Sequence, residues 1–403
     1  MYIKEAIFPP KKLIIVIFVA NCFKKTEIMA ELSGSNRLQS LDAFRGFTIA
    51  AMILVNNPGT WKDVYAPLRH AVWWGITPTD MIPASFLFIV GVAVAFAYTK
   101  RKKAGTPNRK IYSKIIIRSL KIFLVGMFLN LFSLIPELNF EMLRWTGTLH
   151  RIAFVFLCCG LLFLHTSWRM QVFIGTAILL LYYAVLVFIP TPGYGSVMLE
   201  PGINIAHWID QRFLPGHMWQ GNWDPEGFLP NISSVVSGIT GMLAGAYLLT
   251  SASRERKVIN LFLAGGIAII LGILWGWGSI LGVSANLWSP AYVLISSGFA
   301  ASALAGCIYV IDILGKNNNA ATNFGIIYGM NAITVYVLAD LLSPFFYGNK
   351  FWGMSLNSRF IYIMSDALFF TPKFASMCYA ILYVFICFIP VYYLYRKKIF
   401  IKL

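Results

Sequence analysis

A histidine, an asparagine and an aspartate within one short stretch are the strongest candidates for chemistry in this sequence. His70 can exchange a proton near neutral pH, and its ring can also attack an acyl group. Asp80, ten residues later, can fix the imidazole tautomer or hold its cation, and the amide of Asn56 can donate to a developing oxyanion. The alternative is an interfacial histidine that only hydrogen-bonds a loop carbonyl. We expect His70, with Trp73 and Thr77 beside it, to form a site for proton or acyl transfer.

The elements that must position these residues are apolar runs of about 20 residues, the length that crosses a bilayer as a helix. The 403-residue chain is 58% hydrophobic and only 12% charged, whereas a soluble protein carries roughly 25% charged residues. We therefore predict an all-α polytopic membrane bundle with about ten transmembrane helices. The expected spans are 41–56, 81–99, 114–134, 147–165, 170–190, 229–250, 258–278, 289–314, 324–346 and 374–395.

The distribution of Lys and Arg predicts the orientation of the bundle. Alternate loops and the C-terminal tail hold seventeen Lys and Arg on one side, against seven on the other. Cytoplasmic loops are the basic ones, so both ends of the ten-helix core are expected in the cytoplasm. Three long segments, 57–80, 191–228 and 347–373, then face outward. They are rich in Trp, Gly, Pro and His, and Trp belongs both at membrane interfaces and against sugar rings.

The chain is expected to hold one transmembrane domain, residues 37–403, after an N-terminal extension, residues 1–36. The run Leu13 to Phe23 is short for a span and resembles a signal-like apolar region. Met29 opens a stretch that reads like a natural start, so the extension is either an upstream addition or a signal anchor.

Other classes of function are disfavoured by the residues present. The net charge of +17 is explained by basic loops, so we expect no nucleic acid partner. All six cysteines lie in or beside apolar runs and form no CxxC, and the five histidines show no HExxH spacing. We therefore expect neither disulfides nor a metal site.

Several segments together resemble the heparan-α-glucosaminide N-acetyltransferase family and its bacterial homologues. In chain order these segments are RLQSLDAFRGFTIAAMILVNNPG, HAVWWGITPTDMIPASFLFIVG, TLHRIAFVF, WDPEGFLPNISSVVSGITGMLAG, NLWSPAYVL and YGMNAITVYV. Any one of them is weak, but in this order they cover about residues 37–345, nearly the whole core.

The resemblance implies a transmembrane acetyltransferase of the bacterial inner membrane. Such an enzyme takes acetyl from cytoplasmic acetyl-CoA, its co-substrate, and gives it to the amine of a glucosamine-type sugar on the periplasmic side. The family's active-site histidine falls on His70 and its helix-one asparagine on Asn56. The family also suggests a homodimer in the lipid bilayer. Whether His70 acts as general base or as nucleophile stays open, but both roles need neutral imidazole, whose ordinary pKa is about 6.5.

The remaining polar residues carry more than one interpretation. Arg45 either pairs with Asp42 one turn away or meets a CoA phosphate. Arg151, near an outer helix end, meets a phosphate, a carboxylate or the carbonyls of another helix.

Acidic and amide residues near the outer helix ends are candidates of the same kind. Asp224 and Glu226 either cap the helix that follows or orient the amino sugar. Asn286 and Asn331 lie at membrane edges and are candidates to line the same cavity.

Two other functions stay open as alternatives to the N-acetyltransferase. One is a transporter of sugars or amino sugars, although no repeat of the His70 segment occurs after residue 229. The other is a membrane O-acyltransferase that modifies a glycan hydroxyl.

Overall fold

The computed structural model describes residues 38–401 except 106–108, 136–138, 220, 349 and 352. The extension 1–36 and its apolar run therefore lie outside the described residues. The described chain is almost entirely helical, as predicted, with one two-residue strand pair in which β1 (Lys350–Phe351) runs antiparallel to β2 (Met354–Ser355).

Eight described helices are long and apolar enough to cross a membrane. They are α3 (Pro78–Lys103), α4 (Arg109–Ser133), α5 (Thr148–His165), α6 (Trp168–Phe188), α8 (Phe228–Leu248), α9 (Arg254–Trp277), α10 (Pro290–Cys307) with its π-helical extension η3 (Ile308–Ile313), and α14 (Pro372–Arg396). A ninth span results if α11 (Ala320–Met330) and the helix after it, α12 (Ala332–Ser343) with the π-helical turn η4 (Pro344–Gly348), are counted together. The polytopic membrane fold is thus confirmed.

The first expected span is also a helix, α2 (Gln39–Asn56), but it is not among the apolar spans of the described chain. Its first two turns carry Asp42 and Arg45, whose charges lower the hydropathy of an 18-residue helix. The remaining elements are short: η1 (Ala66–Leu68), η2 (Phe140–Met142), α7 (Ile205–Phe213), α13 (Leu356–Tyr362) and η5 (Ile363–Ala367).

Six helices begin at a residue whose side chain caps them. Side-chain oxygens of the residue before the helix accept a backbone N–H in the first turn, which satisfies a donor that the helix itself leaves free. The capping residues are Ser167, Asn204, Ser253, Ser289, Asn319 and Thr371.

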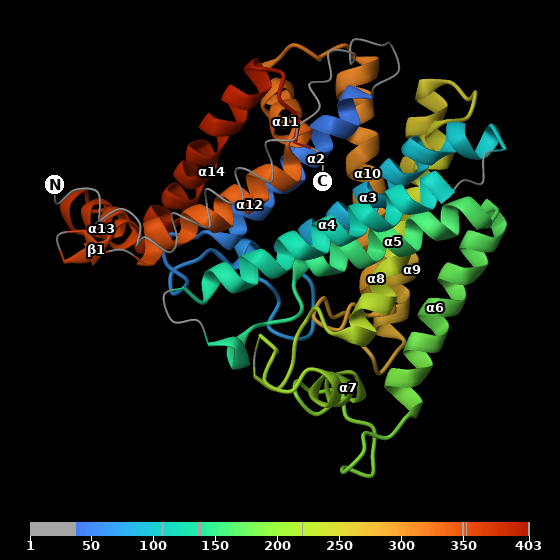
Figure 1. Cartoon of the computed structure of the whole chain (residues 1–403), viewed down its shortest axis with the longest axis horizontal. Coiled ribbons are helices and arrows are strands. Elements are labelled where there is room, and N and C mark those ends of the chain that lie inside the picture. The colour runs from blue at the N-terminus through green and yellow to red at the C-terminus, as the bar shows by residue number, and fades with distance from the viewer. Residues whose placement is uncertain are drawn as a thin grey trace. The chain divides into compact units, whose positions relative to one another are not determined.

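Contacts divide the chain into two compact units. The larger unit comprises residues 70–128 and 140–314, which include α3, α5 to α10 and most of α4. In it α3 packs on α8 and α9 packs on α10 (Figure 1). A Cβ at Gly241 would lie 1.9 Å from the Phe88 carbonyl oxygen. Only glycine allows α3 and α8 to approach this closely.

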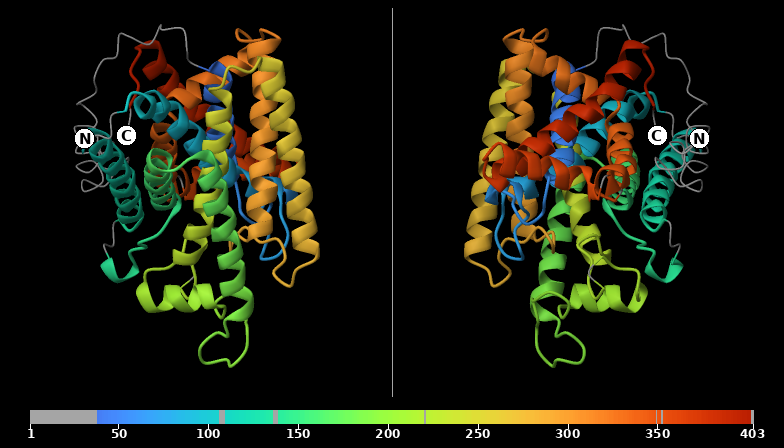
Figure 2. Two further views of the ribbon diagram at one scale, coloured as in Figure 1. Left: turned by 90° about the vertical axis from the view of Figure 1, so that its right-hand side faces the viewer. Right: turned by 90° about the vertical axis from the view of Figure 1, so that its left-hand side faces the viewer.

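One end of the larger unit collects its long loops. The α6–α8 connection, which contains α7, lies beyond the ends of α6 and α8 (Figure 2). The segment 70–77, which leads into α3, and the segment 278–289, which leads into α10, meet at this same end through a bridge between Gly75 and Ser284. The long loops thus assemble at the end where α3, α5, α8 and α10 begin.

The smaller unit contains α2 and α11 to α14. There α2 and α11 cross in contact, since a Cβ at Gly46 would lie 1.8 Å from the Gly325 carbonyl oxygen. The axis bends by 82° between α11 and α12. Asn331 stands at this break, where its Oδ1 accepts the Ile401 N–H at 3.0 Å and its Nδ2 donates to the Ile399 carbonyl at 3.3 Å. The C-terminal segment therefore satisfies the side chain at the break.

Candidate active site

His70 and Asp80 form a hydrogen-bonded pair at the loop-bearing end of the larger unit. The His70 Nδ1 lies 2.7 Å from the Asp80 Oδ1. The Asp80 side chain is 1% exposed, whereas that of His70 is 52% exposed. The ten-residue spacing thus brings together the two residues that the sequence singled out, with the carboxylate inside and the imidazole at the surface.

The Asp80 carboxylate is held in one orientation by the turn that starts α3. Its Oδ2 accepts the Thr77 N–H at 2.8 Å, the Thr77 hydroxyl at 2.9 Å and the Ala71 N–H at 3.2 Å. These three donors hold the carboxylate in place. Its other oxygen, Oδ1, then accepts from His70 Nδ1–H. This arrangement fixes the tautomer of the ring and leaves the lone pair on Nε2, the nitrogen away from Asp80.

The loop between His70 and α3 is anchored by other parts of the same unit. Asn286 Nδ2 donates to the Val72 carbonyl at 3.1 Å, and Gly75 N–H donates to the Val283 carbonyl at 2.8 Å. Gly75 has φ 97°, in the region that favours glycine. Trp73 is 5% exposed, and its Nε1–H donates to the Leu199 carbonyl at 3.0 Å. In this structure Trp73 and Asn286 therefore position the loop.

A chain of aromatic contacts connects Asp80 to Arg151. The Tyr292 hydroxyl donates to the Asp80 backbone carbonyl at 2.5 Å, and its ring packs edge-on against Trp288. The Arg151 guanidinium lies 4.2 Å from the Trp288 ring centroid, a cation–π contact. Trp288 has φ 50°, which is rare for a bulky residue and persists only where packing enforces it. Sequence reasoning missed Trp288 and Tyr292, whose relation to Asp80 depends on tertiary contacts.

Arg151 itself is buried at 4% exposure. Its Nε donates to Asn231 Oδ1 at 2.7 Å, and its terminal nitrogen donates to the Pro225 carbonyl. Of the alternatives that the sequence left open for Arg151, the structure shows the contact with a carbonyl from the segment before another helix.

Asp224 and Glu226 bind an arginine that the sequence analysis did not select. Arg144 donates to Asp224 at 2.7 and 2.6 Å and to Glu226 at 2.5 Å. Thr146 adds a hydroxyl bond to Asp224 at 2.6 Å. Burial alone would raise the pKa of Asp224, but the hydrogen bonds and charge of Arg144 outweigh burial and hold that pKa below its ordinary value. The two acids likewise raise the pKa of Arg144, against the effect of its burial.

The cluster leaves the two acids in different surroundings. Asp224 is fully buried and also accepts the Trp219 and Glu226 N–H groups. The Glu226 side chain is 16% exposed. Asp224 therefore orders the connection before α8, while Glu226 keeps part of its carboxylate at the surface.

Two further buried titratable residues, His207 and Asp210, lie on α7. His207 accepts the Gly202 N–H at Nδ1, stacks on Trp223 and meets the edge of Trp73. Burial lowers the pKa of His207 to about 3, so its ring is neutral. Asp210, one turn on, accepts the Phe228 N–H at 2.9 Å, and burial raises its pKa to about 7. These residues pack the outer loops behind Trp73.

Three predicted site residues belong to the smaller unit. Asn56 is exposed at the last residue of α2. Arg45 lies 3.5 Å from Asp42, the pairing that was one of its two interpretations. Asn331 contacts the C-terminal segment at the α11–α12 break. Gly329 packs on the Asp42 carbonyl, so Asn331 lies near the first turns of α2, roughly 20 Å along that helix from Asn56.

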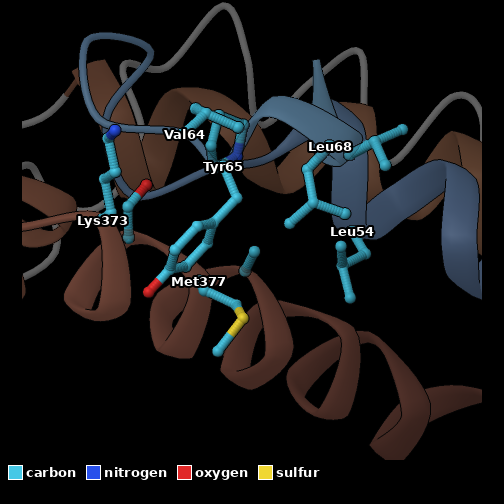
Figure 3. A pocket seen from close by; sticks show the side chains of 10 residues that line it. Leu54, Val64, Tyr65, Leu68, Lys373 and Met377 are labelled. Atoms are coloured by element: carbon cyan, nitrogen blue, oxygen red, sulfur yellow. The ribbon is translucent and has the colours of Figure 1, made fainter. Parts of the chain in front are cut away.

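A small pocket in the smaller unit lies between the loop after α2 and the start of α14 (Figure 3). Val64, Tyr65, Leu68, Lys373 and Met377 line it together with Leu54. Its free volume is about 10 Å³, enough for a single water. It is too small to hold a substrate.

Metal-ligand groupings are absent from the residues that the structure describes: no three His, Cys, Asp or Glu side chains come together. The five described cysteines are all free thiols.

Comparison with known proteins identifies relatives of this chain. Residues 37–201 match the family model of the heparan-α-glucosaminide N-acetyltransferase catalytic region. The heparan-α-glucosaminide N-acetyltransferase of Mus musculus is 26% identical over 366 residues, which cover 78% of this chain and 55% of the relative. That of Homo sapiens is 26% identical over 419 residues, which cover 91% of this chain and 60% of the relative. The chain thus spans somewhat over half the length of these relatives, and the predicted resemblance is confirmed.

Proposed function

We propose that this relative of the heparan-α-glucosaminide N-acetyltransferases is itself a transmembrane N-acetyltransferase. It moves acetyl from cytoplasmic acetyl-CoA to the amine of a glucosamine-type sugar on the periplasmic side of a bacterial inner membrane. The charge distribution supports this sidedness, because the short loops at the end of the larger unit away from His70 carry most of its basic residues. Both ends of the core then face the cytoplasm, and the proposed assembly is a homodimer.

The observation that carries the proposal is the His70–Asp80 pair. Because Asp80 occupies Nδ1, the Nε2 lone pair is the free basic atom at an exposed position. In the base route, Nε2 removes a proton from the sugar amine as the amine nitrogen attacks the thioester carbonyl. The new C–N bond replaces the C–S bond, and the departing CoA thiolate takes up the proton from the imidazolium. The buried Asp80 carboxylate stabilises that imidazolium while it exists.

In the nucleophile route, Nε2 itself attacks the carbonyl and CoA leaves as the thiolate. The amine then takes acetyl from the acetyl-imidazole, which restores the free imidazole, and the proton that the amine loses passes to the CoA thiolate. The two routes differ in one observable. Incubation with labelled acetyl-CoA but no acceptor labels the protein at His70 in the nucleophile route and leaves it unlabelled in the base route.

Further residues keep, in this proposal, the roles that the sequence predicts for them. The exposed Asn56 amide is assigned to the thioester oxygen, where it stabilises negative charge in the transition state. Glu226, with part of its carboxylate accessible, is assigned to the acceptor amine or hydroxyls. Arg45 is assigned to a CoA phosphate.

The other predicted residues act through the loops that they hold. Thr77 orients Asp80, Trp73 and Asn286 fix the loop after His70, and Asp224 and Arg151 fix the segment before α8. Asn331 is assigned a structural role, in which its contact with the C-terminal segment holds the bend between α11 and α12.

The test is acetyl transfer by purified protein in detergent, with labelled acetyl-CoA and glucosamine. We expect acceptor-dependent release of CoA and labelled N-acetylglucosamine, and loss of both in His70→Ala at unchanged folding. Uptake of sugar into vesicles without acetylation would instead support a transporter. Transfer to a glycan hydroxyl but not to glucosamine would support an O-acyltransferase.

A further inference from the structure

One face of α4 carries four cations at helical spacing: Lys110, Lys114, Arg118 and Lys121. At 100° per residue these four positions fall within a sector of about 80°. All four residues are exposed. We call this set the basic stripe; the same face of α4 continues with Val125 and Phe128, which are apolar.

The basic stripe lies beside the sector of α4 that packs on the neighbouring helix. The packed sector meets α5, where the Ser119 hydroxyl donates to the Ala153 carbonyl at 2.8 Å and Gly126 lies against His150. The exposed apolar sector contains Ile116, Ile117, Leu120 and Leu124. By helical spacing the stripe lies between these two sectors. Its Arg118 guanidinium lies 4.8 Å from the Phe156 ring of α5, so the stripe follows the edge of the α4–α5 contact.

The basic stripe also extends deeper than the positive-inside rule requires. With 25 residues, α4 is about 37 Å long, a few ångströms longer than a hydrocarbon core of about 30 Å. Lys121 lies twelve residues after Arg109, about 18 Å along the axis. Snorkelling moves its ammonium group toward the membrane surface by only about 6 Å. The charge therefore stays within the hydrocarbon core of the bilayer. Charges at this depth are expensive unless an anion accompanies them.

Acidic side chains do not supply that anion within the described part of the chain. The ion pairs found there involve Arg45, His70 and Arg144, and none involves the basic stripe. The charge of the stripe is therefore available to a ligand.

We propose that the basic stripe binds the phosphate groups of acetyl-CoA, an inference that rests on the proposed acetyltransferase function. CoA carries a diphosphate and a 3′-phosphomonoester, and four ammonium and guanidinium groups complement that charge. The stripe starts at the basic end of the larger unit and rises toward the end that carries His70. Lysine contributes compact charge and arginine a planar fork, both of which bind phosphate.

Axial distances within the larger unit agree with this assignment. Gly126 lies level with His150 in the first turn of α5, so Lys121 stands about 10 Å along the axis from the start of α5. The pantetheine arm of CoA has thirteen bonds between phosphorus and sulfur, about 15 Å when extended with backbone-like geometry. Phosphates held at the stripe therefore leave the thioester free to reach the loop-bearing end.

The experiment compares donors that do and do not carry phosphate. Steady-state kinetics are measured with acetyl-CoA and with S-acetylpantetheine, for the wild type and for Lys114→Gln, Arg118→Gln and Lys121→Gln. We expect each variant to raise the KM for acetyl-CoA about tenfold, since each loses a charge-assisted phosphate contact. The KM for S-acetylpantetheine and the kcat should stay within twofold. Lys257→Gln on α9, at the same basic end but outside the stripe, is the matched control and should leave both donors unaffected.

Two further measurements separate the possible failures. Lys121→Arg keeps the charge at the deepest position and should retain acetyl-CoA affinity, whatever Lys121→Gln does to folding. Titration of the wild type with CoA itself reports donor binding without catalysis. If the wild type binds CoA and transfers acetyl but the variants show an unchanged KM for acetyl-CoA, the assignment of the basic stripe is overturned. The proposed acetyltransferase function would then still stand. An equal KM rise for both donors that varies with anionic lipid would assign the stripe to lipid headgroups. A wild type that neither binds CoA nor transfers acetyl would remove the proposed function itself.

Discussion

Replacing Asp80 by Asn tests how the carboxylate sets the chemistry of His70. An amide has one acceptor and one donor where the carboxylate has two acceptors. Three donors converge on Oδ2, from Ala71 N–H, Thr77 N–H and the Thr77 hydroxyl, and only one bond is made to Oδ1. The amide oxygen of Asp80→Asn therefore takes the Oδ2 position, and its NH₂ group faces His70 Nδ1.

That orientation reverses the tautomer of the ring. Facing an N–H donor, His70 Nδ1 must accept, so the proton moves to Nε2 and the outward nitrogen loses its lone pair. Restoring the active tautomer sets Nδ1–H against the amide N–H and leaves two donors unpaired, at about 1–3 kcal/mol each. A total of about 2–6 kcal/mol corresponds to a fall in kcat of roughly 30- to 10⁴-fold.

The assay is kcat for acetyl transfer, with thermal unfolding in detergent as the folding control. Thr77→Val is the matched variant, because it removes one donor to Asp80 but keeps the carboxylate; we expect it to lose tenfold or less. If Asp80→Asn kept more than a third of the wild-type kcat while folded, the tautomer argument would be refuted.

Three further predictions concern stability. Arg144→Met leaves the carboxylates of Asp224 and Glu226 without their cation and should lower the free energy of unfolding by about 3–5 kcal/mol; a loss below 1 kcal/mol in denaturant titration would contradict this. Asp210 has a pKa raised to about 7 by burial against about 3.9 unfolded, so the wild type should lose up to about 4 kcal/mol as pH rises from 4 to 7. Asp210→Asn should abolish this slope in unfolding measured across that range, and an unchanged slope would refute it. Gly241→Leu should disrupt folding, seen as aggregation in size-exclusion chromatography, because its Cβ would lie 1.9 Å from a backbone oxygen, whereas Gly266→Leu meets no atom within 4 Å and should be tolerated.

The helical architecture follows from the sequence because hydropathy alone marks a bilayer span. Each expected span corresponds to a helix or to the bent pair α11–α12. The bend itself could not be foreseen, since Asn331 is satisfied by Ile399 and Ile401, about 70 residues later. The low hydropathy of α2 could be foreseen, because Asp42 and Arg45 interrupt its apolar sequence.

The candidate site also contains contacts that could be predicted from the sequence and contacts that could not. His70, Thr77 and Asp80 are close in sequence, and a turn before a helix brings them together, so their contact could be anticipated. Arg144 is 80 residues from Asp224, and no local pattern indicates their pairing.

The contacts of the α10 segment could not be predicted from the sequence either. Tyr292 reaches Asp80 across 212 residues, and Trp288 adopts positive φ only because packing enforces it. Tertiary contacts of this kind leave no periodic signal in the chain.

The most direct test of the central claim uses sealed proteoliposomes with acetyl-CoA outside and glucosamine inside. The central claim is that acetyl transfer between the two depends on His70 Nε2, whose ring is held by Asp80. Wild-type vesicles are expected to accumulate N-acetylglucosamine inside and free CoA outside, whereas vesicles with folded His70→Gln protein should produce neither. Equal accumulation in both preparations would contradict the account, because acetyl would then be crossing without the imidazole.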